Sequence, residues 1–334
     1  MSFLKNKSIL ITGGTGSFGK KFVKRIITKH DPARVIIYSR DEYKQYIMQE
    51  ELKEHSFILR FFIGDVRDKE RLYRAFEGVD TVIHAAALKH VPLMEYNPIE
   101  AVRTNISGAE NVINASIDKG VEKVIALSTD KAVNPVNLYG ATKLVSDKLF
   151  ISANAYSGRK KTSFSVVRYG NVAGSRGSVT PFFMSLKNKG QKTLPVTDER
   201  MTRFWISLDE AVNLVLKVIK IAKGGEIFVS KIPSFRITDL VKAIDTKAIP
   251  EYKGIRPGEK LHEVMITEED SQNAFEYEDE YIIYPRFDWW SIDKRFHEGG
   301  KPVEPGFRYS SDTNKDWLSV EDLRNLLNKI DIIY

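Results

Sequence analysis

A tyrosine and a lysine four positions apart form the first candidate for chemistry, in the run Tyr139-Gly140-Ala141-Thr142-Lys143. Residues at i and i+4 share one face of a helix. A nearby ammonium favours the phenolate, so we expect Lys143 to lower the pKa of Tyr139. Such a tyrosine exchanges a proton with a substrate hydroxyl group near neutral pH. Ser128 and Thr129, at the end of the preceding strand-like run, are placed to hydrogen-bond the same hydroxyl.

A glycine-rich run near the N-terminus is the second candidate. It follows the apolar run at 8–12 and precedes a helical stripe of apolar residues. Its glycines fit both G-x-G-x-x-G, through Gly14, Gly16 and Gly19, and G-x-x-G-x-x-G, through Gly13, Gly16 and Gly19. Glycines in a strand–turn–helix context let the backbone approach a pyrophosphate at the helix N-terminus. The alternative is a plain turn.

The end of the second predicted strand bears on the type of dinucleotide. Ser39 and Arg40 come first there, and Arg40 can pair with a 2′-phosphate, which favours NADP over NAD. Asp41 favours NAD instead, because NAD enzymes usually have a carboxylate at this strand end. The alternative for Arg40 is a solvated surface charge. Asp65 follows the third strand and is placed to accept from an adenine amino group. Its alternative is an N-cap for the segment that starts at Arg67.

The elements that must position these residues alternate between strand and helix patterns. Short β-branched runs occur at 9–12, 35–38, 60–63, 81–84, 124–127 and 164–167, separated by longer segments with helical spacing. This pattern predicts an α/β fold with a doubly wound parallel sheet (Rossmann) and a second, smaller α/β substrate domain. We expect residues 1–170 plus about 200–230 to form the NADP-binding domain. About 171–199 and 231–334 form the interleaved substrate domain.

Composition narrows the class of protein further. The 334 residues carry a net charge of +7 and no cysteine, which excludes disulfides, a thiol nucleophile and a cysteine metal site. His84 and His90 have no spacing that suggests a metal site, so we expect none. Basic residues are spread out, which argues against nucleic acid. No apolar run reaches the roughly 20 residues of a membrane helix. The first strand-like run begins at Ser8, which leaves no room for a signal peptide, so we expect a cytoplasmic protein.

The motifs together resemble the extended short-chain dehydrogenase/reductases that modify nucleotide sugars. The finer resemblance, over nearly the whole chain, is to the inverting UDP-N-acetylglucosamine 4,6-dehydratases, lyases that start the cytoplasmic route to pseudaminic acid on bacterial flagellins and surface glycans. It is weakest at about 241–252 and 275–305. The segments that carry it are 83–92, 128–132, 134–140, 200–205 and 256–263.

Thr129-Asp130-Lys131 separates a dehydratase from a simple epimerase. An epimerase needs only hydride transfer and the tyrosine, whereas a dehydratase must also expel the hydroxyl on sugar carbon 6. Related dehydratases have Asp-Glu here, and this chain has Asp-Lys, as the inverting family does. By that resemblance Asp130 is the acid and Lys131 the base, so we expect burial or nearby cations to lower the pKa of Lys131. The alternative is a loop-capping Asp130 and a solvated Lys131.

The resemblance also implies the ligands and their contacts. The substrate is UDP-N-acetylglucosamine, the product a UDP-4-keto-6-deoxy-L-hexosamine inverted at carbon 5, and the assembly a homo-oligomer, either dimer or hexamer. The alternatives are a UDP-hexose 4-epimerase and a non-catalytic NADP-sensing binder. NADP is expected to contact Gly13, Thr15, Gly16, Ser17, Phe18, Gly19, Ser39, Arg40, Asp65, Val66, Ala85, Ala86, Lys89, Tyr139 and Lys143. The UDP-sugar is expected to contact Lys89, Thr129 and Tyr139, with Asn171, Arg203 and Arg256 at the pyrophosphate, Ser178, Pro181 and Phe182 at the uracil, and Glu259.

Overall fold

A large, mostly parallel sheet organises the molecule. The computed structural model describes residues 2–158, 161–175, 177–285 and 298–330. Within them a ten-stranded sheet has the order β16-β14-β15-β10-β6-β5-β4-β1-β2-β3. The order reverses between β1 and β4, as in a doubly wound sheet, which confirms the predicted fold class. Its strands are β1 (Ser8–Thr12), β2 (Arg34–Ser39), β3 (Leu59–Ile63), β4 (Thr81–His84), β5 (Lys123–Thr129), β6 (Ser163–Tyr169), β10 (Ile227–Ser230), β14 (Ala274–Glu276), β15 (Glu280–Ile283) and β16 (Lys301–Pro302).

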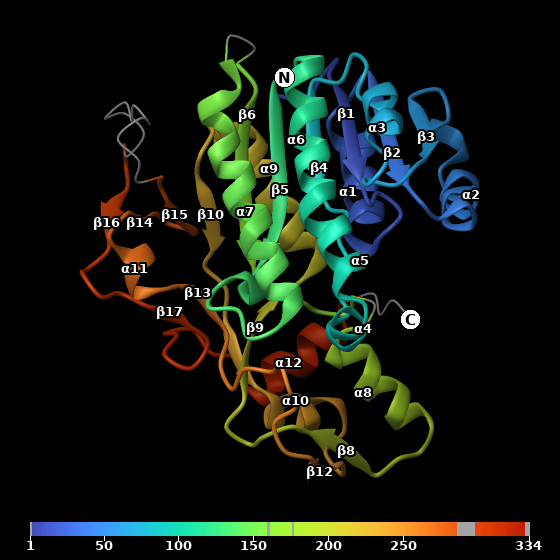
Figure 1. The fold of residues 1–334 in the computed structure, drawn as a ribbon. Helices are drawn as coiled ribbons and strands as arrows, with labels where there is room; N and C mark the ends of the chain where they lie inside the picture. Colours follow the sequence, from blue (N-terminus) through green and yellow to red (C-terminus); the bar gives the residue numbers. More distant parts are fainter. Residues whose placement is uncertain (1, 159–160, 176, 286–297, 331–334) are drawn as a thin grey trace.

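Helices cover both faces of this sheet. Figure 1 shows α6 and α7 in front of the strands and α9 behind them. Because both faces are covered, the inner strands are buried on both sides and apolar at their centres, and all five residues of β1 are buried. The helices are α1 (Ser17–Lys29), α2 (Glu42–Glu51), α3 (Lys69–Ala75), α4 (Val91–Tyr96), α5 (Pro98–Val102), α6 (Gly108–Lys119), α7 (Leu138–Tyr156) and α9 (Leu208–Ile221), with the short helical turns η1 (Lys53–His55), η2 (Arg103–Ser107, a π-helix) and η3 (Asp130–Ala132).

A smaller unit lies below the large sheet in Figure 1, around α8, α10 and α12. It has an apolar core of its own, which includes Phe183, Trp205, Leu240 and Leu323. This is the predicted smaller α/β unit. Its elements are β7 (Asn171–Val172), α8 (Val179–Asn188), β8 (Thr193–Val196), β9 (Thr202–Ile206), β11 (Ser234–Arg236), α10 (Ile237–Ile244), β12 (Ile249–Tyr252) and α12 (Val320–Leu327), with β13 (Val264–Ile266), α11 (Glu268–Ser271) and β17 (Tyr309–Ser310) on the side of the large sheet.

The chain crosses between the two units more often than the predicted boundaries allow. Strands β14 and β15, at 274–283, lie in the stretch expected in the substrate domain, yet β15 pairs antiparallel with β10 and extends the large sheet. Ile282 and Ile283 pack into the core of that sheet and cover its open edge. Conversely, β9 lies in the 200–230 stretch but pairs with β7 and β11. Residues 286–297 and 331–334 of the predicted substrate domain lie outside the described residues.

The carboxyl ends of the central strands meet at one edge of the sheet. Thr12, His84, Thr129 and Tyr169 end β1, β4, β5 and β6 there. Ligands of doubly wound sheets bind beyond this edge, at the point where the strand order reverses. Across the described residues, no helix combines the length and the apolar character that a membrane crossing requires.

Candidate functional site

The glycine-rich turn packs directly against the loop that follows β4. Gly13 has a φ of 67°, and a Cβ there would lie 2.9 Å from the Cα of Ala86. A side chain would therefore force the turn and the loop apart. The Ala86 N–H donates to the Thr12 hydroxyl at 3.2 Å, and that hydroxyl bonds Nδ1 of His84 at 2.9 Å. Burial, with a smaller effect of Lys143, lowers the pKa of His84 to about 3 and keeps the ring neutral.

The first turn of α1 is open at its N-terminal end. Its N-cap residue is Gly16, which carries no side chain, and Ser17 and Phe18 begin the helix. The ring of Phe18 stacks on that of Phe22, with centroids 5.6 Å apart. The buried Thr15 hydroxyl bonds the Ser39 hydroxyl at 2.7 Å and ties this turn to the end of β2. The predicted pyrophosphate contacts thus gather at one helix N-terminus, together with the buried Gly19 and with Ala85.

Charged residues surround the end of β2. Arg40 is 54% exposed, and its guanidinium lies 3.6 Å from the Asp65 carboxylate. The N–H of Arg67 donates to Asp65 at 2.9 Å, but the N-cap of the following helix α3 is Asp68, so the helix-cap alternative for Asp65 is wrong. Asp41 caps α2 by accepting from the Lys44 N–H at 2.9 Å. The residue that favoured NAD is therefore engaged in a helix cap, whereas Arg40 faces solvent.

The loop after β4 is held by a buried asparagine from the π-helical turn η2. Oδ1 of Asn105 accepts from the Leu88 N–H at 2.8 Å, and its Nδ2 donates to the Leu88 carbonyl at 2.9 Å and to the Thr142 hydroxyl at 3.0 Å. One amide therefore joins the loop to α7. Lys89 follows Leu88 at the surface, and desolvation of its ammonium, then the charge of Lys131, lowers its pKa. Val66 is buried in the large core.

Helix α7 carries the tyrosine–lysine pair as predicted. Tyr139 lies in its first turn and hydrogen-bonds Thr129. The expected lowering of its pKa is wrong for this site: burial raises the pKa of Tyr139 to about 12, and Lys131, rather than Lys143, is the cation that opposes the increase. Burial lowers the pKa of Lys143, against the attraction of Asp147. Lys143 itself is 3% exposed.

Ser128 does not join the tyrosine. Its hydroxyl donates to Oδ2 of Asp147 at 2.6 Å in the interior. Asp147 also lies 3.9 Å from the guanidinium of Arg168. Successive side chains of a strand point to opposite faces, so only Thr129 of the Ser-Thr pair reaches the site.

A close approach of α7 to η3 brings the tyrosine next to Lys131. A Cβ on Gly140 would lie 2.1 Å from the Lys131 carbonyl oxygen, a distance that no side chain tolerates. The first turn of α7 is fixed by Asn137, whose Oδ1 accepts from the Gly140 N–H at 2.8 Å. Gly140 is a residue that the sequence reasoning did not single out, although it lies inside the quoted motif.

Lys131 is surrounded by acceptors. Its ammonium lies 3.0 Å from Oδ1 of Asp130 and donates to Oδ1 of Asn171 at 3.0 Å. Asp130 is fully buried and also accepts from the Thr129 hydroxyl at 2.9 Å. The expected lowering of the Lys131 pKa is wrong here, because Asp130 and Glu263 raise it above its ordinary value in spite of burial. Burial raises the pKa of Asp130 in turn.

Glu263 and Lys260 complete this cluster and were missed from the sequence. A Glu263 carboxylate oxygen lies 3.5 Å from the Lys131 ammonium and 3.6 Å from Nε of Arg203. Lys260 donates to the Val133 carbonyl, and burial lowers its pKa. Both residues lie in the segment 256–263, whose resemblance to the family was the available signal.

The predicted pyrophosphate residues have different surroundings. Arg203 is 7% exposed and donates to the carbonyls of 202, 260 and 261, at 2.6, 3.0 and 3.1 Å. Asn171 binds Lys131. Arg256 is exposed and pairs with Glu259, which accepts from Thr197 at 3.0 Å. Of the two arginines predicted to bind the pyrophosphate, Arg256 therefore has an exposed guanidinium and Arg203 a buried one.

The predicted uracil residues begin α8. Ser178 is the N-cap residue, and its buried hydroxyl has no hydrogen-bond partner among the described residues. Pro181 is buried, whereas Phe182 is 51% exposed. An unpaired hydroxyl beside an exposed ring is compatible with a bound base, and the assignment stays a prediction.

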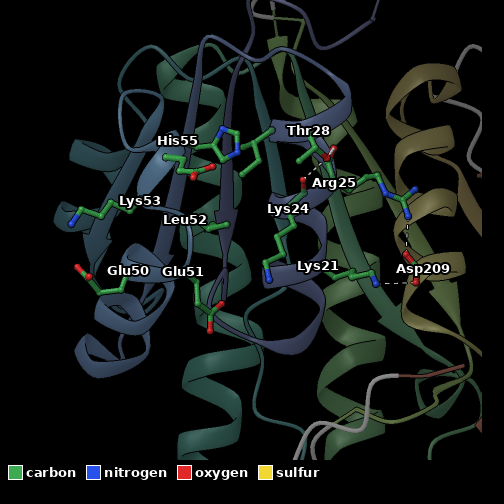
Figure 2. Close-up of a pocket in the computed structure, with 12 residues that line it drawn as sticks. Lys21, Lys24, Arg25, Thr28, Glu50, Glu51, Leu52, Lys53, His55 and Asp209 are labelled. Atoms are coloured by element: carbon green, nitrogen blue, oxygen red, sulfur yellow. Dashed lines mark hydrogen bonds and ion pairs between the residues drawn. The ribbon is translucent and has the colours of Figure 1, made fainter. Parts of the chain in front are cut away.

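A surface groove of about 720 Å³ lies elsewhere, between α1, the end of α2 and η1 (Figure 2). Its charges neutralise one another, because Lys21 and Arg25 pair with Asp209 at 2.9 and 2.7 Å. It shares no residue with the predicted site. Within the described parts of the chain, no group of three or more histidines and carboxylates could hold a metal ion.

Comparisons with known proteins place this site among sugar-nucleotide enzymes. The family described as polysaccharide biosynthesis protein matches residues 9–285. A UDP-N-acetylglucosamine 4,6-dehydratase (inverting) from Campylobacter jejuni subsp. jejuni serotype O:2 is 55% identical over 96% of this chain and 97% of its own. A UDP-glucose 4-epimerase from Rickettsia canadensis is 41% identical, over 96% and 95%. The X-ray structure of Pen from Bacillus thuringiensis, 41% identical, covers 98% of both chains with a TM-score of 0.89. Structures that share the fold at 24% identity or less include enzymes with NAD bound.

Proposed function

The chain belongs to the polysaccharide biosynthesis protein family of extended short-chain dehydrogenase/reductases, and from that premise we propose that it is an inverting UDP-N-acetylglucosamine 4,6-dehydratase that uses NADP. Its product is then a UDP-4-keto-6-deoxy-L-hexosamine for pseudaminic acid and surface-glycan synthesis. The reaction has no net redox change, so the enzyme is a lyase. We further propose that it works in the cytoplasm as a homo-oligomer.

The observation that carries this proposal is the pair formed by the buried Asp130 and the partly buried Lys131 beside Tyr139. Epimerisation needs no second acid–base pair, whereas elimination of water needs an acid for the leaving oxygen and a base for the carbon-bound proton. Asp130 and Lys131 lie 3.0 Å apart at the end of β5, and Thr129 hydrogen-bonds both Asp130 and Tyr139. One threonine therefore links the residue for oxidation to the pair for elimination.

The residues at the first turn fit a dinucleotide. Gly13, with its close approach to Ala86, and the open N-terminus of α1 suit a pyrophosphate. Arg40, exposed at the end of β2, suits a 2′-phosphate, which supports NADP. These residues would hold NADP, which would supply the hydride acceptor for oxidation at sugar carbon 4 and the hydride donor for reduction at carbon 6.

Tyr139 serves the oxidation at carbon 4. Its phenolate accepts the hydroxyl proton as the hydride leaves carbon 4. Because burial raises the pKa of Tyr139 to about 12, positive charge close to the phenol is needed before it can act as a base near neutral pH. Lys131 supplies part of that charge.

A single proton shared by Asp130 and Lys131 accounts for elimination. In the resting pair the aspartate is ionised and the lysine is an ammonium. Transfer of that proton across 3.0 Å gives a neutral acid and a neutral amine together. The amine then takes the proton of carbon 5, and the acid protonates the hydroxyl leaving carbon 6. The ion pair is restored with a balanced count of protons, and water is the leaving product.

The remaining contacts and the stereochemistry complete the proposal. Arg256 is suited to the pyrophosphate and Phe182 to the uracil, because both side chains are exposed. A proton that reaches carbon 5 from the opposite face gives the inverted L-sugar. The support for inversion is the 55% identity to an enzyme of that name.

Product analysis tests the function. The purified protein is incubated with UDP-N-acetylglucosamine and NADP⁺, and the products are followed by NMR. A 4-keto-6-deoxy sugar inverted at carbon 5 is expected. The rival is 4-epimerisation, favoured by the relatives named UDP-glucose 4-epimerase at 41% identity. A product that keeps its carbon-6 hydroxyl and differs only at carbon 4 would establish the rival instead.

A further inference from the structure

Glu263 is a buried carboxylate that no step of the reaction above uses. It is 3% exposed and directly precedes β13, far along the chain from Asp130 and Lys131. Its Oε1 lies 3.5 Å from the Lys131 ammonium. Its Oε2 is buried and has no hydrogen-bond partner among the described residues. An ionised oxygen left in this state is costly unless cations surround it.

Three cations do surround it. Arg203 lies 3.6 Å away, Lys131 3.5 Å away, and Lys260 acts on it from the preceding turn. These charges keep the pKa of Glu263 below its ordinary value, so it remains ionised. Ser310 of β17 and Ser311, which follows that strand, are neutral neighbours that hydrogen-bond the backbone of Glu263.

Lys131 is thereby held on three sides by acceptors, namely Asp130, Asn171 and Glu263. An ammonium has three donors, so this arrangement fixes the direction of the side chain. Among the described residues, Asp130 and Glu263 are the two carboxylates beside the Lys131 ammonium, and Glu259 is a further carboxylate that acts on Arg203.

We propose that Glu263 is a positioning residue for elimination: its buried carboxylate directs Lys131 toward Asp130 and sets the pH range in which this pair carries one shared proton. The inference rests on the proposed dehydratase function. Its physical basis is that a negative charge a few ångströms away favours proton binding by both members of the pair. Loss of the charge therefore moves both of their titrations to lower pH.

The test compares Glu263→Gln, which keeps the shape and removes the charge, with Glu280→Gln as a matched control. Glu280 is equally buried and pairs with Lys217 at 2.5 Å, but it lies on β15, outside the cluster. The elimination step is followed as exchange of the carbon-5 hydrogen in deuterated water, from acidic to alkaline pH. We expect the limbs of the Glu263→Gln profile to move to lower pH by at least about one unit, and the control profile to match wild type.

Glu263→Ala tests the positioning itself. Elimination should slow at least about tenfold, while the first hydride transfer, read as NADPH absorbance in a single turnover, should change less than about threefold. Equal slowing of both steps, together with an unmoved pH profile in Glu263→Gln, would overturn the proposal. If the alanine variant does not fold, the glutamine profile alone decides. A wild-type protein that dehydrates nothing rejects the proposed function, whereas a dehydrating wild type with an unmoved glutamine profile rejects only the role of Glu263.

Discussion

The glycine-rich turn at Gly13 and the charge cluster of Asp130, Lys131 and Glu263 differ in the groups that they offer a ligand. The turn around Gly13 offers backbone groups and neutral hydroxyls, and its one proposed ionic contact, Arg40, is 54% exposed. In the cluster, the side chains of Asp130 and Glu263 are 0% and 4% exposed, and charges face charges. Water screens the first region and not the second. A substitution in the turn should therefore affect only the contact that it removes. A substitution in the cluster should also affect the neighbouring residues, because removing one buried charge leaves others uncompensated.

Lys131→Ala should have the largest effect. Loss of the base, with Asp130 and Glu263 left without their shared cation, should reduce elimination roughly 10⁴-fold. The free energy of unfolding should fall by about 3 kcal/mol, since a buried pair is broken. Some NADPH should still form in a single turnover, but more slowly than in wild type, because Lys131 supplies only part of the positive charge that Tyr139 needs as a base.

Lys131→Arg is the matched variant, because it keeps the cation but cannot lose its proton. It should recover most of the thermal stability and none of the elimination. An alanine variant that makes the 4-keto-6-deoxy product at near wild-type rate would contradict the role of Lys131. It would also remove the contrast between the two regions.

Tyr139→Phe should abolish most of the first hydride transfer, by roughly 10²–10⁴-fold, since the phenol is the general base at carbon 4. NADP binding should persist because the glycine turn is untouched, and this is measured by titration. Thermal stability should change little, since the ring remains. Near-normal NADPH formation in a single turnover would rule out Tyr139 as the base.

Gly140→Ala should disturb the charge cluster through the backbone, without removing any of its charges. Its Cβ would meet the Lys131 carbonyl oxygen, so α7 or η3 must shift and separate Tyr139 from Lys131. A shift of about 1 Å costs roughly 10²-fold in turnover. Gly120→Ala is the control: it also strains the backbone, at a φ of 69°, but its Cβ meets open space at the end of α6. It should lose stability by about 1 kcal/mol and keep its activity; equal activity of the two variants would refute the argument.

Arg40→Ala should have the smallest effect of these substitutions, and that effect should be confined to NADP affinity. NADP affinity should fall about tenfold, because one charge-assisted contact with the 2′-phosphate is lost. NAD affinity should stay within about twofold, since NAD lacks that phosphate, and the variant should fold with wild-type stability. Equal losses for both dinucleotides in a binding titration would show that Arg40 does not read the phosphate.

Local spacing predicted the parts of the site that are local in the chain. The glycines precede α1, and Tyr139 and Lys143 share a helix, because those arrangements are set within a few residues. Glu263 and Lys260 were missed because nothing near them in sequence shows that they meet Lys131. Neither pKa direction follows from the spacing of Tyr139 and Lys143. Burial raises the pKa of Tyr139, and Asp130 together with Glu263, 132 positions away, raises that of Lys131.

For the fold as well, features that are local in the chain were predicted and long-range pairings were not. Short apolar runs separated by helical segments predicted the parallel strands, because strands buried on both faces are mostly apolar. The return of β14 and β15 to the large sheet was not predicted, since Tyr281-Ile282-Ile283 looks like any short buried strand and its partner β10 is distant in the chain.

The start of α7 is held by residues from the last third of the chain, and this has a consequence for biosynthesis. Nδ2 of Asn137, the cap of that helix, donates to the Gly258 carbonyl across 121 positions, and Lys260 reaches Val133 across 127. A ribosome releases these segments one after the other, and contacts of such long range form late. The dinucleotide turn can therefore assemble on a growing chain while the proton-transfer pair is still open to water. We therefore expect the nascent protein to form its dinucleotide-binding turn before its catalytic residues are in place.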